Sequence, residues 1–140
     1  MFDVGLGLQS LGSGILPFLI YFVTGCLLTT GFVALYASVT PHEELKLIKA
    51  DKTGAAVSFA GALIGFALPM AAIISQAVTF WDFLFWGVAA GLVQLGAFFA
   101  FRAVFPRISG RIEAGEAAAP TALAAMHVAV GLINAASLVY

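Results

Sequence analysis

Four long apolar segments dominate this chain of 140 residues and decide how it can fold. They cover residues 14–39, 53–76, 82–105 and 118–139, and each has the roughly 20 residues that a helix needs to cross a hydrocarbon core. A backbone in lipid must satisfy its own hydrogen bonds, so each segment is a helix unless a closed barrel forms. The segments are rich in Ala and Leu and lack the alternation of barrel strands. The sequence therefore predicts an all-α membrane protein with four transmembrane helices.

The composition excludes an ordinary soluble domain. Apolar residues make up 62% of the chain and charged residues 9%, with a mean hydropathy of +1.07. In soluble domains the apolar fraction averages about 45–50% and the charged fraction about 25%. The sequence has no basic block suited to nucleic acid. Its one cysteine, Cys26, rules out an intrachain disulfide and a cysteine-rich metal site. We therefore expect residues 1–140 to form a single integral membrane domain that contacts lipid and does not bind nucleic acid.

The basic residues predict the orientation of the chain. All six lie in or beside two polar connections, residues 38–56 and 103–119, and four crossings put both connections on one face of the membrane. By the positive-inside rule that face is cytoplasmic, so both termini lie outside. The residues expected to form the cytoplasmic hinges are Lys46, Lys49, Lys52, Arg107 and Arg111.

The link between the second and third segments is short. Its five residues, AVTFW, allow only a tight turn, so the two helices are antiparallel neighbours. Thr79 followed by Asp82 three residues later is typical of a helix N-terminus, and it predicts that Thr79 caps the third helix.

The chain repeats itself at an interval of about 65 residues. The stretch FLIYFVTGCL matches FLFWGVAAGL, and LPMAA matches LINAA with a one-residue slip. These matches predict two helical-hairpin repeats, residues 14–76 and 82–139, which insert in the same direction as parallel repeats. The matched pairs in the two polar connections are Pro41 with Pro106 and Lys46 with Arg111.

Several stretches carry a family resemblance: TPHEELKLIKADKTGAA, GALIGFALPMA, DFLFWG, LVQL and AVGLINAAS. From about Ile15 onward the chain resembles the YjfL-type bacterial inner-membrane proteins, whose repeated unit is domain of unknown function family 350. The resemblance implies four helices in the bacterial inner membrane and no established activity. With the orientation that the basic residues predict, both termini are periplasmic. Members are often encoded beside envelope-stress genes, which implies a cytoplasmic or membrane stress-response protein as partner. His127 and Lys52 are departures from the family pattern.

The first polar connection contains the letters HEE at residues 42–44. A metal site is one interpretation, but no second histidine follows at helical spacing, so the zinc-protease pattern fails. The preferred interpretation is a short interfacial helix with Thr40 as N-cap, Pro41 at the first position and Glu43 at the third. Its basic side would reach anionic headgroups through Lys46, Lys49 and Lys52. We therefore expect no metal site here.

A polar layer is predicted at mid-membrane, since the midpoints of the four segments fall near Thr29, Gly65, Gln94 and His127. The carbonyl of Gly65 loses its usual helical partner because Pro69, four residues on, has no N–H. Such a layer could hold an ion or relay protons. Alternatively, its members hydrogen-bond one another and hold the helices together. We favour the second interpretation, because one histidine without an acidic partner is a poor relay.

Two GxxxG patterns lie on the second and third segments, Gly61–Gly65 and Gly87–Gly91. Small residues at this spacing let two helix backbones approach closely. The sequence leaves open whether they pack within one chain or between chains of a homo-oligomer.

No nucleophile–base pair and no paired carboxylates are evident in the sequence, so we expect neither an enzyme nor a bound cofactor. Two functions remain. The first is a membrane interaction protein of the envelope-stress response, whose cytoplasmic hinges contact a partner or lipid. The alternative is an oligomeric channel or transporter for an ion or small solute, built around the polar mid-membrane layer.

Overall fold

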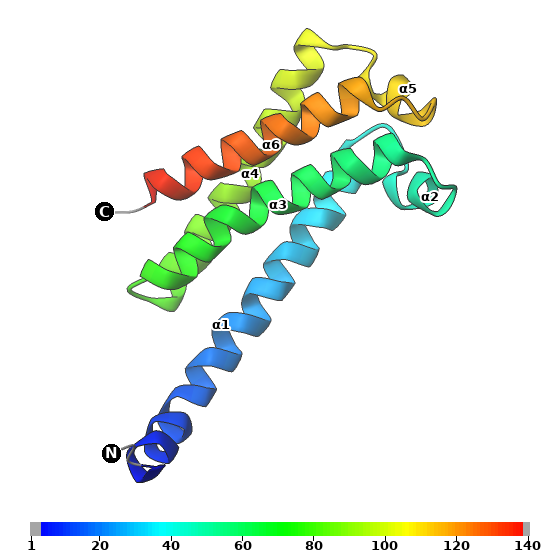
Figure 1. The fold of residues 1–140 in the computed structure, drawn as a ribbon. Coiled ribbons are helices and arrows are strands. Elements are labelled where there is room, and N and C mark those ends of the chain that lie inside the picture. Colours follow the sequence, from blue (N-terminus) through cyan, green and yellow to red (C-terminus); the bar gives the residue numbers. More distant parts are fainter. Residues whose placement is uncertain (1–3, 139–140) are drawn as a thin grey trace.

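The computed structural model describes residues 4–138, and this part of the chain is helical throughout apart from its turns and connections (Figure 1). Four helices are long and apolar enough to cross a membrane. Two short helices lie in the connections that follow the first and the third of these long helices. The prediction of an all-α membrane protein with four spans is confirmed. The helices are α1 (Val4–Val39), α2 (Glu44–Lys49), α3 (Thr53–Gln76), α4 (Phe80–Val104), α5 (Ile108–Glu113) and α6 (Ala118–Ser137).

Three of the four long helices begin within two residues of their predicted start, but α1 does not. It begins at Val4 rather than at residue 14, and Pro17 lies inside it without ending it. Polar side chains in the added turns bond within the helix, as the Ser13 hydroxyl does to the carbonyl of Gln9 (3.1 Å). A helix of 36 residues is about 54 Å long, well beyond a hydrocarbon core of roughly 30 Å.

Only the second half of α1 joins the bundle. Its buried residues are Gly25, Phe32 and Tyr36, while its first half projects away from the other helices (Figure 1). Phe32 stacks on Phe66 of α3, with ring centroids 4.5 Å apart. The bundle core is therefore made by α3, α4 and α6 together with the last turns of α1.

The closest packing in the molecule joins α3 to α6, which run side by side from the same end (Figure 1). A Cβ at Gly61 would collide with the backbone of Ala124, and one at Gly65 would collide with the carbonyl of His127. Gly131 of α6 in turn lies against the backbone of Gly65. The first GxxxG pattern therefore packs within the chain, against the helix that is last in sequence.

The second GxxxG pattern faces α1 and α3. A Cβ at Gly87 would meet the Leu28 side chain at 2.8 Å, and one at Gly91 would meet Phe32 and Phe66 at 3.6 Å. These neighbours are side chains rather than backbone, so this approach is looser than that of α3 and α6. Whether copies of the chain associate stays a prediction.

Both short helices lie at one end of the bundle, which we call the hinge end; the α3–α4 turn lies at the opposite end (Figure 1). The long–short–long order occurs twice, and Val104 ends α4 65 positions after Val39 ends α1. The duplication itself, with repeats over 14–76 and 82–139, stays a prediction. At the opposite end Thr79 caps α4 as predicted, since its hydroxyl accepts from the backbone N–H of Asp82 (3.1 Å).

The α3–α6 contact predicts that Gly61→Ala destabilises the protein. The new methyl group meets backbone that cannot rotate away, and overpacking of this kind costs about 1–3 kcal/mol. Gly96→Ala is the matched control, because a Cβ at Gly96 meets nothing within 4 Å. Unfolding of the two purified variants in mixed micelles measures the difference. Equal free energies of unfolding would show that α3 and α6 do not touch through Gly61.

Candidate functional site

A network of buried polar groups lies at mid-depth and is centred on Gln94 of α4. The Gln94 side-chain nitrogen donates to the carbonyl oxygens of Gly65 on α3 (2.8 Å) and His127 on α6 (3.2 Å). Its side-chain oxygen lies 2.7 Å from Nδ1 of His127. Both side chains are fully buried. Three of the four predicted residues of the mid-membrane layer therefore meet, and they join three helices.

The carbonyl of Gly65 is available because of Pro69. A residue with an N–H at position 69 would take that carbonyl into the helix, whereas proline leaves it free. The side-chain nitrogen of Gln94 donates to this free carbonyl, and it also donates to the His127 carbonyl. The glycine lets α6 come close enough for one amide to bridge both helices.

The hydrogen bonds fix the tautomer of His127. The side-chain oxygen of Gln94 only accepts, so Nδ1 of His127 carries the proton and donates. The other ring nitrogen, Nε2, is then an acceptor, and the hydroxyl of Tyr36 lies 3.4 Å from it. Tyr36 is 1% exposed and its ring also packs edge-on against His127.

The sequence did not indicate Tyr36, and the midpoint of the first apolar segment predicted Thr29 in the layer instead. The hydroxyl of Thr29 donates to the carbonyl of Gly25 in its own helix (2.8 Å), so it takes no part in the network. α1 crosses the bundle at an angle (Figure 1), and it contacts His127 through Tyr36, close to its C-terminal end. Tyr36 lies two turns after Thr29 on the same face of α1, and this spacing is the signal that could have identified it.

A second buried polar cluster lies at the hinge end and ties the two connections together. Nδ1 of His42 lies 3.2 Å from the hydroxyl of Ser109 on α5. Nε2 of His42 lies 3.2 Å from Oε1 of Glu44, and both side chains have no exposed surface. The Thr40 hydroxyl bonds the same carboxylate. We call these four residues, Thr40, His42, Glu44 and Ser109, the hinge cluster.

The predicted start of the short helix in the first connection was wrong. Glu43, not Thr40, is at the N-cap position, with no side-chain cap, and the helix begins at Glu44. The Thr40 hydroxyl is not free to cap, because it bonds the Glu44 carboxylate and the carbonyl of Tyr36 (3.0 Å). The three side chains of the HEE stretch lie in different environments. Those of His42 and Glu44 are buried, whereas that of Glu43 is 72% exposed and pairs with Lys46 (3.0 Å).

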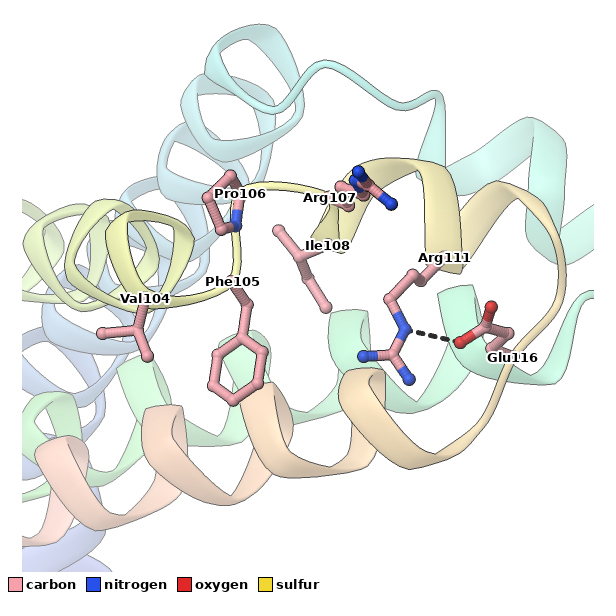
Figure 2. A pocket seen from close by; sticks show the side chains of 7 residues that line it. All are labelled: Val104, Phe105, Pro106, Arg107, Ile108, Arg111 and Glu116. Atoms are coloured by element: carbon pink, nitrogen blue, oxygen red, sulfur yellow. Dashed lines mark hydrogen bonds and ion pairs between the residues drawn. The ribbon is translucent and has the colours of Figure 1, made fainter.

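The basic hinge residues fall into two groups. Lys46 is paired with Glu43, and Arg111 with Glu116 through its Nε at 2.5 Å (Figure 2). Exposed pairs of this kind contribute about 0–1 kcal/mol each to stability. Among residues 4–138 the structure shows no ion pair for the other predicted hinge residues, Lys49, Lys52 and Arg107.

The fold and these two clusters define a multi-pass α-helical membrane protein with a polar core at mid-depth and a fixed surface at one end. The family model described as Domain of Unknown Function (DUF350) matches residues 10–138, and the chain belongs to that family. It is 32% identical over 126 residues to the UPF0719 inner membrane protein YjfL of Escherichia coli (strain K12), covering 90% of this chain and 96% of that one.

The protein of the same name from Escherichia coli O157:H7 matches to the same extent. No solved structure matches the chain. With four spans in the structure and these relatives, the chain is a multi-pass inner-membrane protein, as the sequence predicted.

The mid-depth network predicts that Gln94→Leu lowers stability more than Thr29→Val. The first change removes three hydrogen bonds and leaves the Gly65 carbonyl and a ring N–H of His127 without their partner. Hydrogen bonds between transmembrane helices average about 0.6 kcal/mol, so the loss should be about 2 kcal/mol. The second change removes one bond within α1. Thermal unfolding of both purified variants tests this, and equal shifts in Tm would show that the network does not hold the helices together.

Proposed function

We propose that the protein is a non-enzymatic interaction component of the inner membrane, and that the α2–α5 surface at the hinge end docks its partners on the cytoplasmic side. The partners are lipid and a cytoplasmic or membrane protein of the envelope-stress response. The observation that carries the proposal is the hinge cluster, which joins two connections far apart in the sequence into one surface.

Burial of the hinge cluster costs free energy that a simple connection between two helices would not require. Burial of a histidine and a carboxylate loses their hydration, and only mutual contacts and hydrogen bonds offset that loss. Here the Glu44 carboxylate contacts the Thr40 hydroxyl and Nε2 of His42. Nδ1 of His42 in turn contacts the Ser109 hydroxyl. A connection that only reverses the chain needs none of these groups. Fixed relative placement of α2 and α5 is what a docking surface requires.

Basic groups on this surface are available to a partner. Lys49 and Arg107 are exposed and carry no ion pair within residues 4–138. Orientation by the positive-inside rule puts them where anionic headgroups and acidic protein segments occur. The stress-response partner is supported by the gene neighbourhoods of the family that the sequence resembles.

The alternative function, a channel or transporter for an ion or small solute, has less support from the geometry. The polar groups of Gln94 and His127 bond one another and the backbone of neighbouring helices. Groups engaged in this way hold helices together, as the favoured interpretation of the mid-membrane layer expects. The channel therefore stays an alternative prediction.

Photo-crosslinking in native membranes tests the docking surface. The photoreactive residue p-benzoylphenylalanine replaces Lys49 on α2 in one variant and Val78 in the other, which lies in the α3–α4 turn and is 83% exposed. We expect a protein adduct of one defined mass from position 49, identified by mass spectrometry, and none from position 78. The same adducts from both positions, or no protein adduct from position 49, would contradict the proposal.

A further inference from the structure

We propose that the cavity between the end of α4 and α5 binds the phosphate of an anionic phospholipid from the leaflet at the hinge end. The inference rests on the proposed function and deepens it by assigning one ligand to one part of the α2–α5 surface. Three observations carry it: the place and shape of the cavity, its free cationic donors, and its contrast with the matching cavity at α2.

The cavity lies where the chain leaves the apolar part of α4. It holds about 580 Å³. One side is lined by Val104, Phe105 and Pro106, and the other by Arg107, Ile108, Arg111 and Glu116. Figure 2 shows this division, with Val104 and Phe105 apart from the two guanidinium groups. An amphipathic ligand with an apolar end and a polar end fits such a division.

Two arginines supply donors for a phosphate. Arg107 is exposed and has no ion pair among residues 4–138. Arg111 uses its Nε for Glu116, so the four N–H groups on its two terminal nitrogens have no partner in the described part of the chain. A guanidinium group matches phosphate oxygens in bidentate geometry, which a lysine does not do. With Glu116 counted, the lining keeps one net positive charge.

The apolar side of the cavity suits acyl chains. Val104 is 73% exposed and Phe105 is 40% exposed, and both lie at the end of a helix that is apolar enough to span the membrane. Side chains so placed contact the upper part of the lipid tails when α4 is in a bilayer. The ligand is therefore a lipid phosphate rather than a free one.

The matching cavity at α2 has the opposite charge. It holds about 530 Å³ and is lined by Pro41, Glu43, Lys46, Leu47, Ala50 and Glu113. Its one cation is already paired with Glu43 (3.0 Å), and Glu113 adds a second carboxylate. This cavity repels an anion, although Pro41 and Lys46 align with Pro106 and Arg111 in the predicted repeat. The chain therefore offers an internal control for the α5 cavity.

Native mass spectrometry of the purified full-length protein measures the binding. Dioctanoyl phosphatidylglycerol and dioctanoyl phosphatidylcholine are titrated onto the wild type, Arg107→Gln/Arg111→Gln and the control Lys46→Gln/Lys49→Gln. Each basic group near an anionic surface contributes roughly fivefold to affinity, so the arginine double variant should lose about 25-fold for phosphatidylglycerol. The lysine double variant removes the same charge but no residue that lines the α5 cavity, so its loss of affinity should be well below that of the arginine double variant. Glu116→Gln should bind more tightly, because it removes the one carboxylate of the cavity.

Equal losses in the two double variants would overturn the inference, since they would show a diffuse charge effect rather than a site. Competition by inorganic phosphate at the lipid's own concentration would overturn the lipid assignment and indicate a free-phosphate site. If the arginine double variant unfolds, Glu116→Gln still tests the site. Tighter binding of phosphatidylglycerol by Glu116→Gln supports the site, and unchanged affinity would contradict it. Crosslinks from position 49 do not depend on this cavity. If the cavity does not bind lipid, the crosslinking experiment therefore still tests the docking surface independently.

Discussion

The backbone contact of α3 with α6 is the interaction on which the rest of the core depends. Apolar side chains gain little from meeting each other in lipid, so helices there associate through close packing and hydrogen bonds. Gly61 and Gly65 remove the side chains that would hold α6 away. Only at that separation can the Gln94 amide reach a carbonyl on each helix, and only then does His127 meet Tyr36 of α1.

The hinge end depends on a different balance. There the chain buries His42 and Glu44, whose loss of hydration must be offset by polar contacts, and one of these, between His42 and Ser109, joins the first connection to the second. The result is that α2 and α5 keep one relative position although about 60 residues separate them. A surface of this kind presents fixed charges at the membrane boundary. Its two halves differ chemically, because arginines line the cavity at α5 and carboxylates line the cavity at α2.

The sequence predicted the four spans because hydropathy over 20 residues is a local property. It also brought Gly65, Gln94 and His127 together, because depth in a membrane can be counted along a helix. It failed for Tyr36, which depends on the angle at which α1 crosses the bundle. It failed again for His42 and Glu44: polar residues in a connection are usually solvated, and their burial here depends on Ser109, which is remote in sequence.

The proposed function requires that the α2–α5 surface face the cytoplasm. Accessibility of single cysteines tests it most directly, with Glu113→Cys on α5 and Val78→Cys in the α3–α4 turn, each in a Cys26→Ser background; both positions are exposed. With a membrane-impermeant maleimide, we predict labelling of Val78→Cys in intact spheroplasts and of Glu113→Cys only after the membrane is broken. Labelling of Glu113→Cys in intact spheroplasts would contradict the claim.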